Sequence, residues 1–539
     1  MTSRSTIASD SIPLWFLILL AVAWILPGLI GHEPWKPDEA YSFGLVYHIL
    51  QTGDWVVPTL AGEPFMEKPP LFYLTAALFA KIFSAWLPLH DGARLATGFY
   101  MTLTLLFTGL AARELYGRAT GAILALLACI GLIPLAHLLI TDIALLAGLA
   151  LSLYGLALGT RRTVIGGLCL GTGAGIAFLS KGLLGPGLLG LTALLLPLLH
   201  PVWRSRGYVV GLLVAGAATL PWVLVWPLAL YLRSPELFSV WLWDNNFGRF
   251  LGSSRLGPRQ DTLFYLRTLP WFAWPSWLLA LWGLWRMGRD GLRQPDVLLP
   301  LAALTVMLLA LMGASDARQV YALPLLLPLA LLSARAMGFL SGRTEIMFYA
   351  LAVTVTLIAL LLPWGVWISL IQGVVLFAAL DPPSTPTTIF FWSTAIAILF
   401  SLGGLFALYA LRQQRERAVA TWAIAATLFS GLIMTLLLDT IDSQKSYRDT
   451  MTSLKNALPA TYDCVASEGL GEPQRAMIEY YAGVQTLRRA VQPNAKCQLM
   501  LRQEWVTEPL AYDSRQWRVL WVGQRPGDTK EKFRLYQRL

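Results

Sequence analysis

The stretch IPLWFLILLAVAWILPGLIG, at positions 12–31, carries no charged residue and is long enough to cross a bilayer as one helix. It is too long and too rich in Trp for the core of a signal peptide, and no small-residue cleavage site precedes the acids that follow it, so we expect a retained span. Similar runs recur up to residue 438. The chain of 539 residues is 56% hydrophobic and only 13% charged, whereas soluble domains carry about 25% charged residues. The sequence therefore predicts a polytopic membrane protein.

Arginine-rich loops indicate which ends of these spans face the cytoplasm. They are ARELYGR (112–118), TRR (160–162), WRSRG (203–207), RMGRDGLR (286–293), SARAMGFLSGR (333–343) and LRQQRER (411–417). Two spans and a short turn separate successive members, so we place the intervening turns outside. The net charge of +10 sits mostly in these loops, as membrane orientation requires, and does not indicate a nucleic-acid-binding face.

The first outer loop, 32–93, fixes the number of spans. An odd number of crossings must separate residue 69 from residue 112, yet two apolar runs lie between them. We assign LFYLTAALFAKIFSAWLPL, which starts at residue 71 and is interrupted by Lys81, to a helix lying in the outer interface. About thirteen spans remain, near 13–31, 94–112, 121–138, 143–159, 164–180, 182–199, 208–231, 268–285, 297–313, 320–337, 346–370, 388–410 and 418–438.

The composition becomes globular after residue 438. Strand-like pieces such as CQLMLRQ and RVLWVGQ alternate with a helix-like EPQRAMIEYYAGV, which predicts a small α/β domain at 439–539 on the outer side. Cys464 and Cys497 lie in this tail, where a disulfide is open to them if the tail is outside the cytoplasm. The expected architecture is an all-α membrane domain, 1–438, followed by this periplasmic domain.

The conspicuous charges outside the arginine-rich loops all fall on the outer side of this topology. They are Asp38, Glu39, Glu67, Lys68, Asp142, Lys181, Asp244, Arg249, Arg259, Asp316 and Arg318. Charges at membrane depth are costly and are usually paired or functional. One outward-facing site built from several loops is the simplest account. In such a site a carboxylate can deprotonate an acceptor, while Lys, Arg and Tyr321 hold a phosphate leaving group.

Simpler interpretations remain open beside this one. Asp38 and Glu39 would serve equally as helix caps in an exposed loop. Asp142 and Lys181 lie at span ends, where snorkelling or a mutual salt bridge is the usual arrangement. The loop arginines would serve as anchors for lipid head groups.

The stretch PDEAYSFGLVYHILQTGDWVVPTLAGEPFMEKPPLFYL (37–74) closely resembles the first outer loop of the bacterial aminoarabinose transferase family, within the protein-mannosyltransferase-like GT-C superfamily. That family has an Asp-Glu pair on one interfacial helix and EKPP opening a second. Further matches are ITDIALL (140–146), LSKG (179–182), NNFGRFLG (245–252), ARQVYALPLLLP (317–328), QKSYR (444–448) and the tail GQRPGDTKEKFRLYQR. The likeness covers nearly the whole chain.

The resemblance implies a GT-C glycosyltransferase with an outward active site and a polyprenyl-phosphate sugar donor, usually undecaprenyl phosphate. Asp38 matches the family's proposed catalytic acid, and Lys68 and Tyr321 match residues that hold the donor phosphate. Arg249 lies in the matching loop motif. Glu67 matches a metal-binding glutamate, which implies a divalent zinc or magnesium ion.

The chain departs from the family pattern in three places. Tyr41 and Ser42 stand where the family has Arg-Tyr, so one phosphate-side cation is missing. Arg259, in RQDTLFY (259–265), replaces a histidine metal ligand, which puts a bound metal in doubt. Ala317 precedes Arg318 where Lys-Arg is usual.

We therefore predict an inner-membrane glycosyltransferase that moves a sugar from a polyprenyl phosphate to a lipid A, glycan or protein acceptor at the periplasmic face. Aminoarabinose transfer to lipid A is the nearest named activity. A flippase for lipid-linked sugars, a protein O-mannosyltransferase-like enzyme and an assembly protein whose tail binds a partner are the alternatives. The predicted site comprises catalytic Asp38 and Glu39, phosphate-binding Lys68, Arg249, Arg318 and Tyr321, the further candidates Asp142, Lys181 and Arg259, and Glu67 for any metal.

Overall fold

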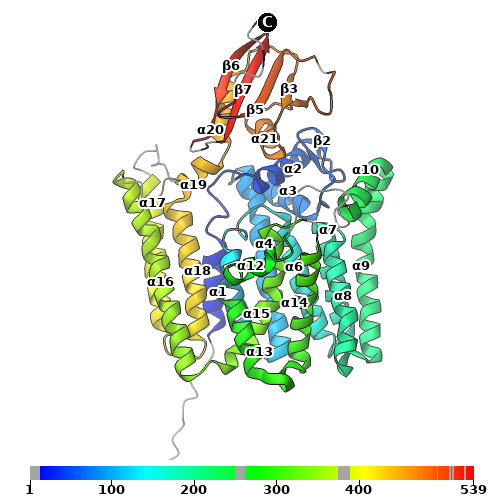
Figure 1. Ribbon diagram of the computed structural model, residues 1–539, viewed down its shortest axis with the longest axis vertical. Coiled ribbons are helices and arrows are strands. Elements are labelled where there is room, and N and C mark those ends of the chain that lie inside the picture. Colours follow the sequence, from blue (N-terminus) through cyan, green and yellow to red (C-terminus); the bar gives the residue numbers. More distant parts are fainter. Residues whose placement is uncertain are drawn as a thin grey trace, which may run out of the picture.

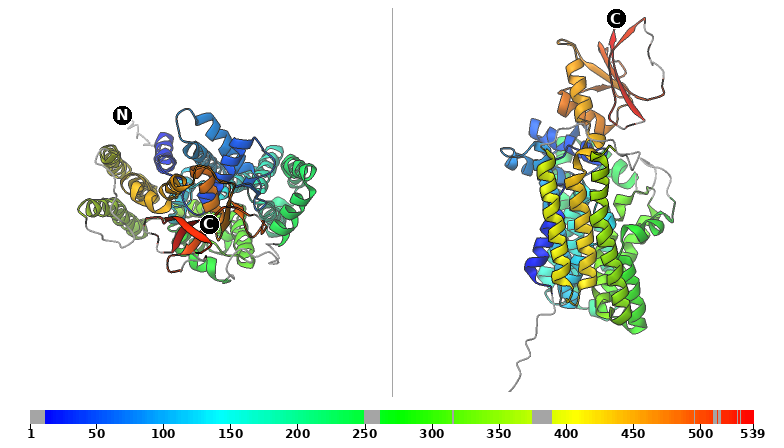
Figure 2. Two further views of the ribbon diagram at one scale, coloured as in Figure 1. Left: turned by 90° about the horizontal axis from the view of Figure 1, so that it is seen from above. Right: turned by 90° about the vertical axis from the view of Figure 1, so that its left-hand side faces the viewer.

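The structure is a computed structural model. It describes residues 12–248, 261–314, 316–373, 389–494, 496–508, 512, 515–526, 528 and 530–539. Helices stand side by side in one bundle, and the C-terminal domain covers one end of it (Figure 1; Figure 2).

Within the described ranges, nine helical segments are long and apolar enough to cross a membrane. They are α4 (Leu89–Tyr116), α6 (Thr141–Leu158), α7 (Thr163–Lys181), α9 (Arg206–Arg233), α14 (Pro295–Gly313), η4 (Gln319–Leu325) with α15 (Leu326–Ala336) and η5 (Met337–Phe339), α16 (Gly342–Ile371), α17 (Ile389–Leu411) and α18 (Arg417–Leu436). The shorter apolar helices α1 (Leu14–Ile25) and α8 (Leu184–Leu199) join the bundle. The predicted all-α membrane class is confirmed.

Burial divides the bundle into an inside and a rim. In the most apolar 18 residues of α6, 94% of the stretch is buried inside the protein, whereas in the corresponding stretch of α9 only 11% is buried. Leucine side chains such as Leu213 and Leu232 of α9 are exposed, which is the arrangement expected of a helix that faces lipid.

Two of the predicted spans are not continuous helices. The segment 121–138 forms α5 (Thr120–Leu127) and a single turn, η1 (Ile130–Leu132). The segment 268–285 is divided into α12 (Phe264–Phe272) and α13 (Ser276–Leu292). Pro275 explains the second break, because proline lacks an N–H and disfavours a helical residue before it.

The first outer loop folds over the end of the bundle. It contains α2 (Asp38–Thr52), a hairpin of β1 (Thr59–Leu60) and β2 (Glu63–Pro64), and α3 (Leu71–Phe83). At 1.5 Å per residue, the 13 residues of α3 span about 20 Å, too short for a bilayer core of about 30 Å. Helices α2 and α3 lie together at the end that carries the C-terminal domain, as an interfacial position requires (Figure 1). Beyond α9, α10 (Pro235–Ser239) and η3 (Val240–Gly248) lie at the same end.

The C-terminal domain combines helices with a five-stranded sheet of order β4-β3-β5-β7-β6. The strands are β3 (Val465–Glu468), β4 (Leu487–Arg488), β5 (Leu499–Trp505), β6 (Trp517–Gly523) and β7 (Glu531–Arg538); the helices are α19 (Leu438–Lys445), α20 (Arg448–Ala457), α21 (Glu472–Met477) and η6 (Ile478–Ala482). β3 pairs parallel with β4 and β5, whereas β7 pairs antiparallel with β5 and β6. Cys464 and Cys497 form a disulfide that joins the start of β3 to the segment before β5.

Candidate active site

A cavity of about 230 Å³ lies where the first outer loop, the helix ends and the C-terminal domain meet. Its walls come from α2, the loop before α3, the start of α6, the end of α7, the segment around η4, and α21. The polar residues that line it are Asp38, Tyr41, Glu67, Lys68, Asp142, Lys181, Asp316, Arg318, Tyr321 and Glu472. The structure thus brings together, from distant parts of the chain, seven of the predicted site residues.

Asp38 is the first residue of α2 and faces this cavity. A carboxylate is favoured there, because the first turn of a helix has unpaired N–H groups and a partial positive charge. The Asp38 side chain makes no hydrogen bond or ion pair with a described residue. Its carboxylate is therefore available to a ligand.

Lys68 and Tyr41 form one wall of the cavity. The Lys68 ammonium donates a hydrogen bond of 2.6 Å to the Tyr41 hydroxyl. Burial alone would lower the pKa of Lys68, but Tyr73, Asp142 and Asp38 outweigh it and raise the pKa, so Lys68 stays charged. Burial, together with Asp38, raises the pKa of Tyr41 far above its usual range. Tyr41 therefore stays protonated, and its hydroxyl can donate a hydrogen bond to an anion in the cavity.

Lys181, Asp142 and Tyr321 also line the cavity. Lys181 and Asp142 make an ion pair, the arrangement that the simpler interpretation expected, and this pair lines the cavity. The Lys181 ammonium also lies 4.3 Å from the centre of the Tyr321 ring. Arg318 lies just before η4. Burial alone would lower the pKa of Arg318, but Tyr321 and Asp38 outweigh burial and raise the pKa, so the guanidinium stays charged.

Glu39, predicted to share the catalytic work of Asp38, does not line the cavity. Glu39 is only 1% exposed and points away from the cavity. One of its oxygens is 2.6 Å from Arg94 Nε and accepts the Leu139 N–H at 3.3 Å. The other accepts the Trp35 N–H at 3.0 Å. Its acceptor positions are therefore taken by the protein.

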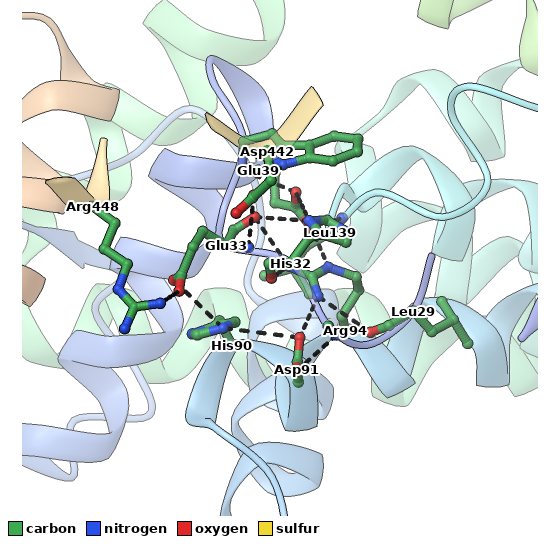
Figure 3. Close-up of polar contacts among 12 residues, drawn as sticks. Leu29, His32, Glu33, Glu39, His90, Asp91, Arg94, Leu139, Asp442 and Arg448 are labelled. Carbon is green, nitrogen blue, oxygen red and sulfur yellow. Dashed lines mark hydrogen bonds and ion pairs between the residues drawn. The ribbon is translucent and has the colours of Figure 1, made fainter. Parts of the chain in front are cut away.

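Arg94, near the start of α4, is the centre of a buried polar cluster (Figure 3). Its guanidinium is wholly buried and binds Glu39, Asp91 at 2.7 Å, and the carbonyls of Leu29 and His32 at 3.2 and 3.0 Å. This cluster joins the end of the first span to the N-terminus of α2. It fixes the helix that presents Asp38.

The C-terminal domain is attached to the same loop. Glu33 accepts hydrogen bonds from Arg448 at 2.8 Å and from the Tyr481 hydroxyl at 2.5 Å. Asp442 accepts the Trp35 indole N–H at 2.7 Å, and burial raises the pKa of Asp442 to about 6. Figure 3 shows Glu33 between Arg448 and the Arg94 cluster.

Close packing of α21 on α2 places Glu472 at the cavity. A Cβ on Gly44 of α2 would lie 2.5 Å from the Ala476 Cβ of α21, so only glycine permits this approach. The hairpin of β1 and β2 also contacts the C-terminal domain, because Arg488 Nε of β4 donates a hydrogen bond of 2.8 Å to Glu63 of β2. Glu472, the first residue of α21, therefore lines a cavity whose other walls belong to the membrane domain.

Comparison with known proteins gives the same family that the sequence motifs indicate. An undecaprenyl phosphate-α-4-amino-4-deoxy-L-arabinose arabinosyl transferase of Pseudomonas aeruginosa is 33% identical over 342 residues, 60% of this chain and 59% of the relative. Its counterpart in Pseudomonas fluorescens is 30% identical over 341 residues, 59% and 56% of the two chains. The chain is similar in sequence to these transferases over this part of its length. It matches somewhat less than three fifths of the length of these two relatives, and no protein-family model matches it.

The fold of the aminoarabinose transferases extends over almost the whole chain. The crystal structure of ArnT from Cupriavidus metallidurans bound to undecaprenyl phosphate superposes with a TM-score of 0.73 at 18% identity, covering 97% of both chains. The Archaeoglobus fulgidus oligosaccharyltransferase superposes with a TM-score of 0.52 at 13% identity, over 91% of this chain and 67% of that one. The predicted GT-C fold is confirmed.

The aminoarabinose transferase resemblance implied a metal ion at Glu67, but the described residues do not provide a site for one. No group of three or more His, Cys, Asp or Glu side chains is arranged to hold a metal among them. Arg259, which replaces the family histidine, lies outside the described residues, as does Arg249. We assign no chemical step to a metal.

The predicted site omitted Tyr41, Asp316, Glu472 and Arg94. Asp316 stood among the outer-side charges of the sequence, and Tyr41 stood at a family position that usually carries a cation. Arg94 is a charge inside a predicted span, which is a signal for a buried pair. Glu472 gave no signal, because only the packing of α21 on α2 brings it to the cavity.

Proposed function

We propose that this protein is an integral-membrane glycosyltransferase that moves a sugar from a polyprenyl phosphate, with undecaprenyl phosphate as the carrier, to an acceptor such as lipid A. The observation that carries the proposal is the single cavity that joins the Asp38 carboxylate to Lys68, Arg318 and Tyr321. Its homologues are named as transferases of 4-amino-4-deoxy-L-arabinose from undecaprenyl phosphate. Transfer of that sugar to lipid A is the activity we consider first.

The proposed location is the bacterial inner membrane, with the cavity and C-terminal domain on the periplasmic side. The Cys464–Cys497 disulfide supports this orientation, because disulfides persist in oxidising compartments and are rare in the cytosol. The arginine-rich loops support it as well, since they lie at the end of the bundle opposite the C-terminal domain (Figure 1). We propose 1–438 as the catalytic unit and 439–539 as the periplasmic domain.

In the proposed reaction, Asp38 acts as general base. The acceptor oxygen attacks the sugar carbon that bears the phosphate, and its proton passes to the Asp38 carboxylate. The bond from this carbon to the phosphate oxygen breaks, and its electron pair leaves with the polyprenyl phosphate. One direct displacement of this kind inverts the configuration at the sugar carbon.

Lys68, Arg318 and Tyr41 are the proposed ligands of the departing phosphate. A cation or a donated hydrogen bond stabilises the charge that develops on the leaving oxygen more strongly in a site with little water. Tyr41 takes the place of the cation that the family carries there, because its hydroxyl keeps its proton beside Lys68. Tyr321 and Lys181 also line the cavity.

The described lining residues include carboxylates that suit a donor with an amino group. Asp38, Asp142 and Asp316 line the cavity beside Lys68, Lys181 and Arg318, and one oxygen of Asp316 is buried. An ammonium group on the sugar would be attracted to these carboxylates. Glu472 lies on the C-terminal domain, so we assign it to the sugar or acceptor side of the site.

The test is transfer of sugar by purified protein in proteoliposomes. Asp38→Asn preserves the shape of the side chain and removes the base, so we expect the transfer rate to fall by about 10²–10⁴-fold. Glu236→Gln is the control, because Glu236 is an exposed carboxylate of α10 at the same end of the bundle. Wild-type turnover in Asp38→Asn would exclude Asp38 as the base. Transbilayer movement of the donor without any transfer would instead identify a flippase.

A further inference from the structure

A second cavity, of about 200 Å³, lies at the end of the bundle opposite the C-terminal domain. It is open to the surface and is lined by the end of α4, the start of α5, the end of α15 and the segment that leads into α18. These segments are far apart in the sequence. The catalytic cavity contains none of them.

Three arginines from three separate segments line this cavity: Arg118, Arg335 and Arg415. Arg335 is 3.2 Å from Asp296 and is thereby paired. Neither Arg118 nor Arg415 makes an ion pair within 4.0 Å with a described residue. Two guanidinium groups therefore face the cavity without a carboxylate partner in contact.

Glu416 is the single acid among the described lining residues, and it does not cancel this charge. One of its oxygens is buried and has no hydrogen-bond partner. Burial raises the pKa of Glu416, although the nearby Arg118 and Arg415 lower it. Two arginines without a carboxylate in contact, against this one acid, leave the described lining positively charged.

Backbone N–H groups at this cavity also favour the binding of an anion. The helices α5 and α18 both begin at this cavity, and neither has a side chain that caps its N-terminus. Uncapped first-turn N–H groups and the helix dipole favour an anion. Gly121 lines the cavity, where a Cβ would meet Met337 Sδ at 2.9 Å and Ala334 Cβ at 3.3 Å, so glycine allows α5 to begin this close to α15.

We propose that this cavity binds a phosphate group through Arg118 and Arg415. Arginines that only orient a membrane protein need to lie on one side of it, whereas Arg118 and Arg415, both partly open to solvent, line one pocket together with two uncapped helix starts. The ends of α4 and α15 and the start of α18 are termini of helices long and apolar enough to cross a membrane, so we expect them near the lipid phosphates. The ligand is therefore the phosphate of an anionic lipid head group or a free phosphate from solution.

The test compares wild type with the double variant Arg118→Gln/Arg415→Gln, using full-length protein in detergent. Phosphatidylglycerol in one arm and inorganic phosphate in the other are titrated, and bound lipid is measured by native mass spectrometry and stabilisation by thermal unfolding. We expect the double variant to bind at least about tenfold more weakly. Arg343→Gln is the control, because Arg343 is an exposed arginine at the same end of the bundle, outside the cavity, and we expect it to bind as wild type does.

The two arms identify the source of the phosphate. Tight binding of phosphatidylglycerol that the double variant loses assigns the site to lipid, and stabilisation by inorganic phosphate alone assigns it to a soluble ligand. If the double variant binds phosphatidylglycerol and inorganic phosphate as tightly as wild type does, the proposal is overturned and these arginines serve orientation only. Should the double variant not fold, the single variants Arg118→Gln and Arg415→Gln provide the same comparison.

Discussion

Replacing Arg94 by glutamine tests the most connected polar group of the fold. The guanidinium is 0% exposed and lies 2.6 Å from Glu39 and 2.7 Å from Asp91. Removing it leaves two carboxylates buried without their cation, and breaking a buried ion pair in this way costs about 3–5 kcal/mol. We expect Arg94→Gln to lower the free energy of unfolding by about this amount and, for a chain of 539 residues, the unfolding midpoint by roughly 3–4 °C.

The change also alters how stability depends on pH. In the wild type, burial alone would raise the pKa of Glu39, but Arg94 outweighs it and lowers the pKa. A lowered pKa contributes stability above the unfolded value of 4.5, and this contribution is lost as the pH falls through the folded value. Without Arg94 the sign reverses, because a buried, unpaired Glu39 gains stability on protonation. Acidification should therefore reduce the difference in the free energy of unfolding between Arg94→Gln and wild type.

Thermal unfolding of the detergent-solubilised protein, followed by tryptophan fluorescence between pH 4 and 8, measures both effects. Arg161→Gln is the matched control: Arg161 pairs with Glu114 at 3.2 Å but is 72% exposed, and exposed pairs contribute only about 0–1 kcal/mol. The double variant Arg94→Gln/Glu39→Gln should lose less than the sum of the single losses, because the pair is coupled. An Arg94→Gln midpoint equal to that of Arg161→Gln would refute the assignment of Arg94 as the anchor of α2.

Three further predictions concern the site and its support. Lys68→Gln should weaken donor binding about tenfold or more, because one charge-assisted hydrogen bond is worth about 1.5–3 kcal/mol; unchanged KM for a lipid-phosphate sugar would contradict this. Glu472→Gln should lower kcat/KM about tenfold for an amino-sugar donor and less for the hydroxyl analogue, and equal losses for both donors would exclude recognition of the amino group. The raised pKa of Asp442, about 6, gives stability that is present below its unfolded value of 3.8 and lost as the pH rises through 6. Asp442→Asn should therefore remove part of the dependence of the free energy of unfolding on pH between pH 4 and 6. We expect this part to be on the order of 1 kcal/mol after discounting for partial solvent exposure. A pH dependence of the variant equal to that of wild type would show that Asp442 does not titrate there.

The candidate site shows which inferences a sequence supports. Asp38, Lys68 and Tyr321 were placed together because hydropathy and loop arginines put all three on one side of the membrane. The sequence did not distinguish Asp38 from Glu39, because neighbouring helical residues point about 100° apart and only the packing of α2 on α4 determines which carboxylate faces the cavity. The same packing hides Glu39 against Arg94 and leaves Asp38 at the cavity.

The chain by itself predicted most of the apolar spans and the position of the charged loops at one end of the bundle, because the cost of burying charge in lipid is a local property of each segment. It also predicted that the run starting at residue 71 lies at the interface, since an odd number of crossings must separate residues 69 and 112 and Lys81 interrupts this run. Only the tertiary structure decided which charges meet, that α5 and α12 stop short, and that Glu472 of the C-terminal domain lines the catalytic cavity. Those outcomes depend on the close approach of segments hundreds of residues apart, such as Gly44 against Ala476, and no local property of either segment specifies that contact.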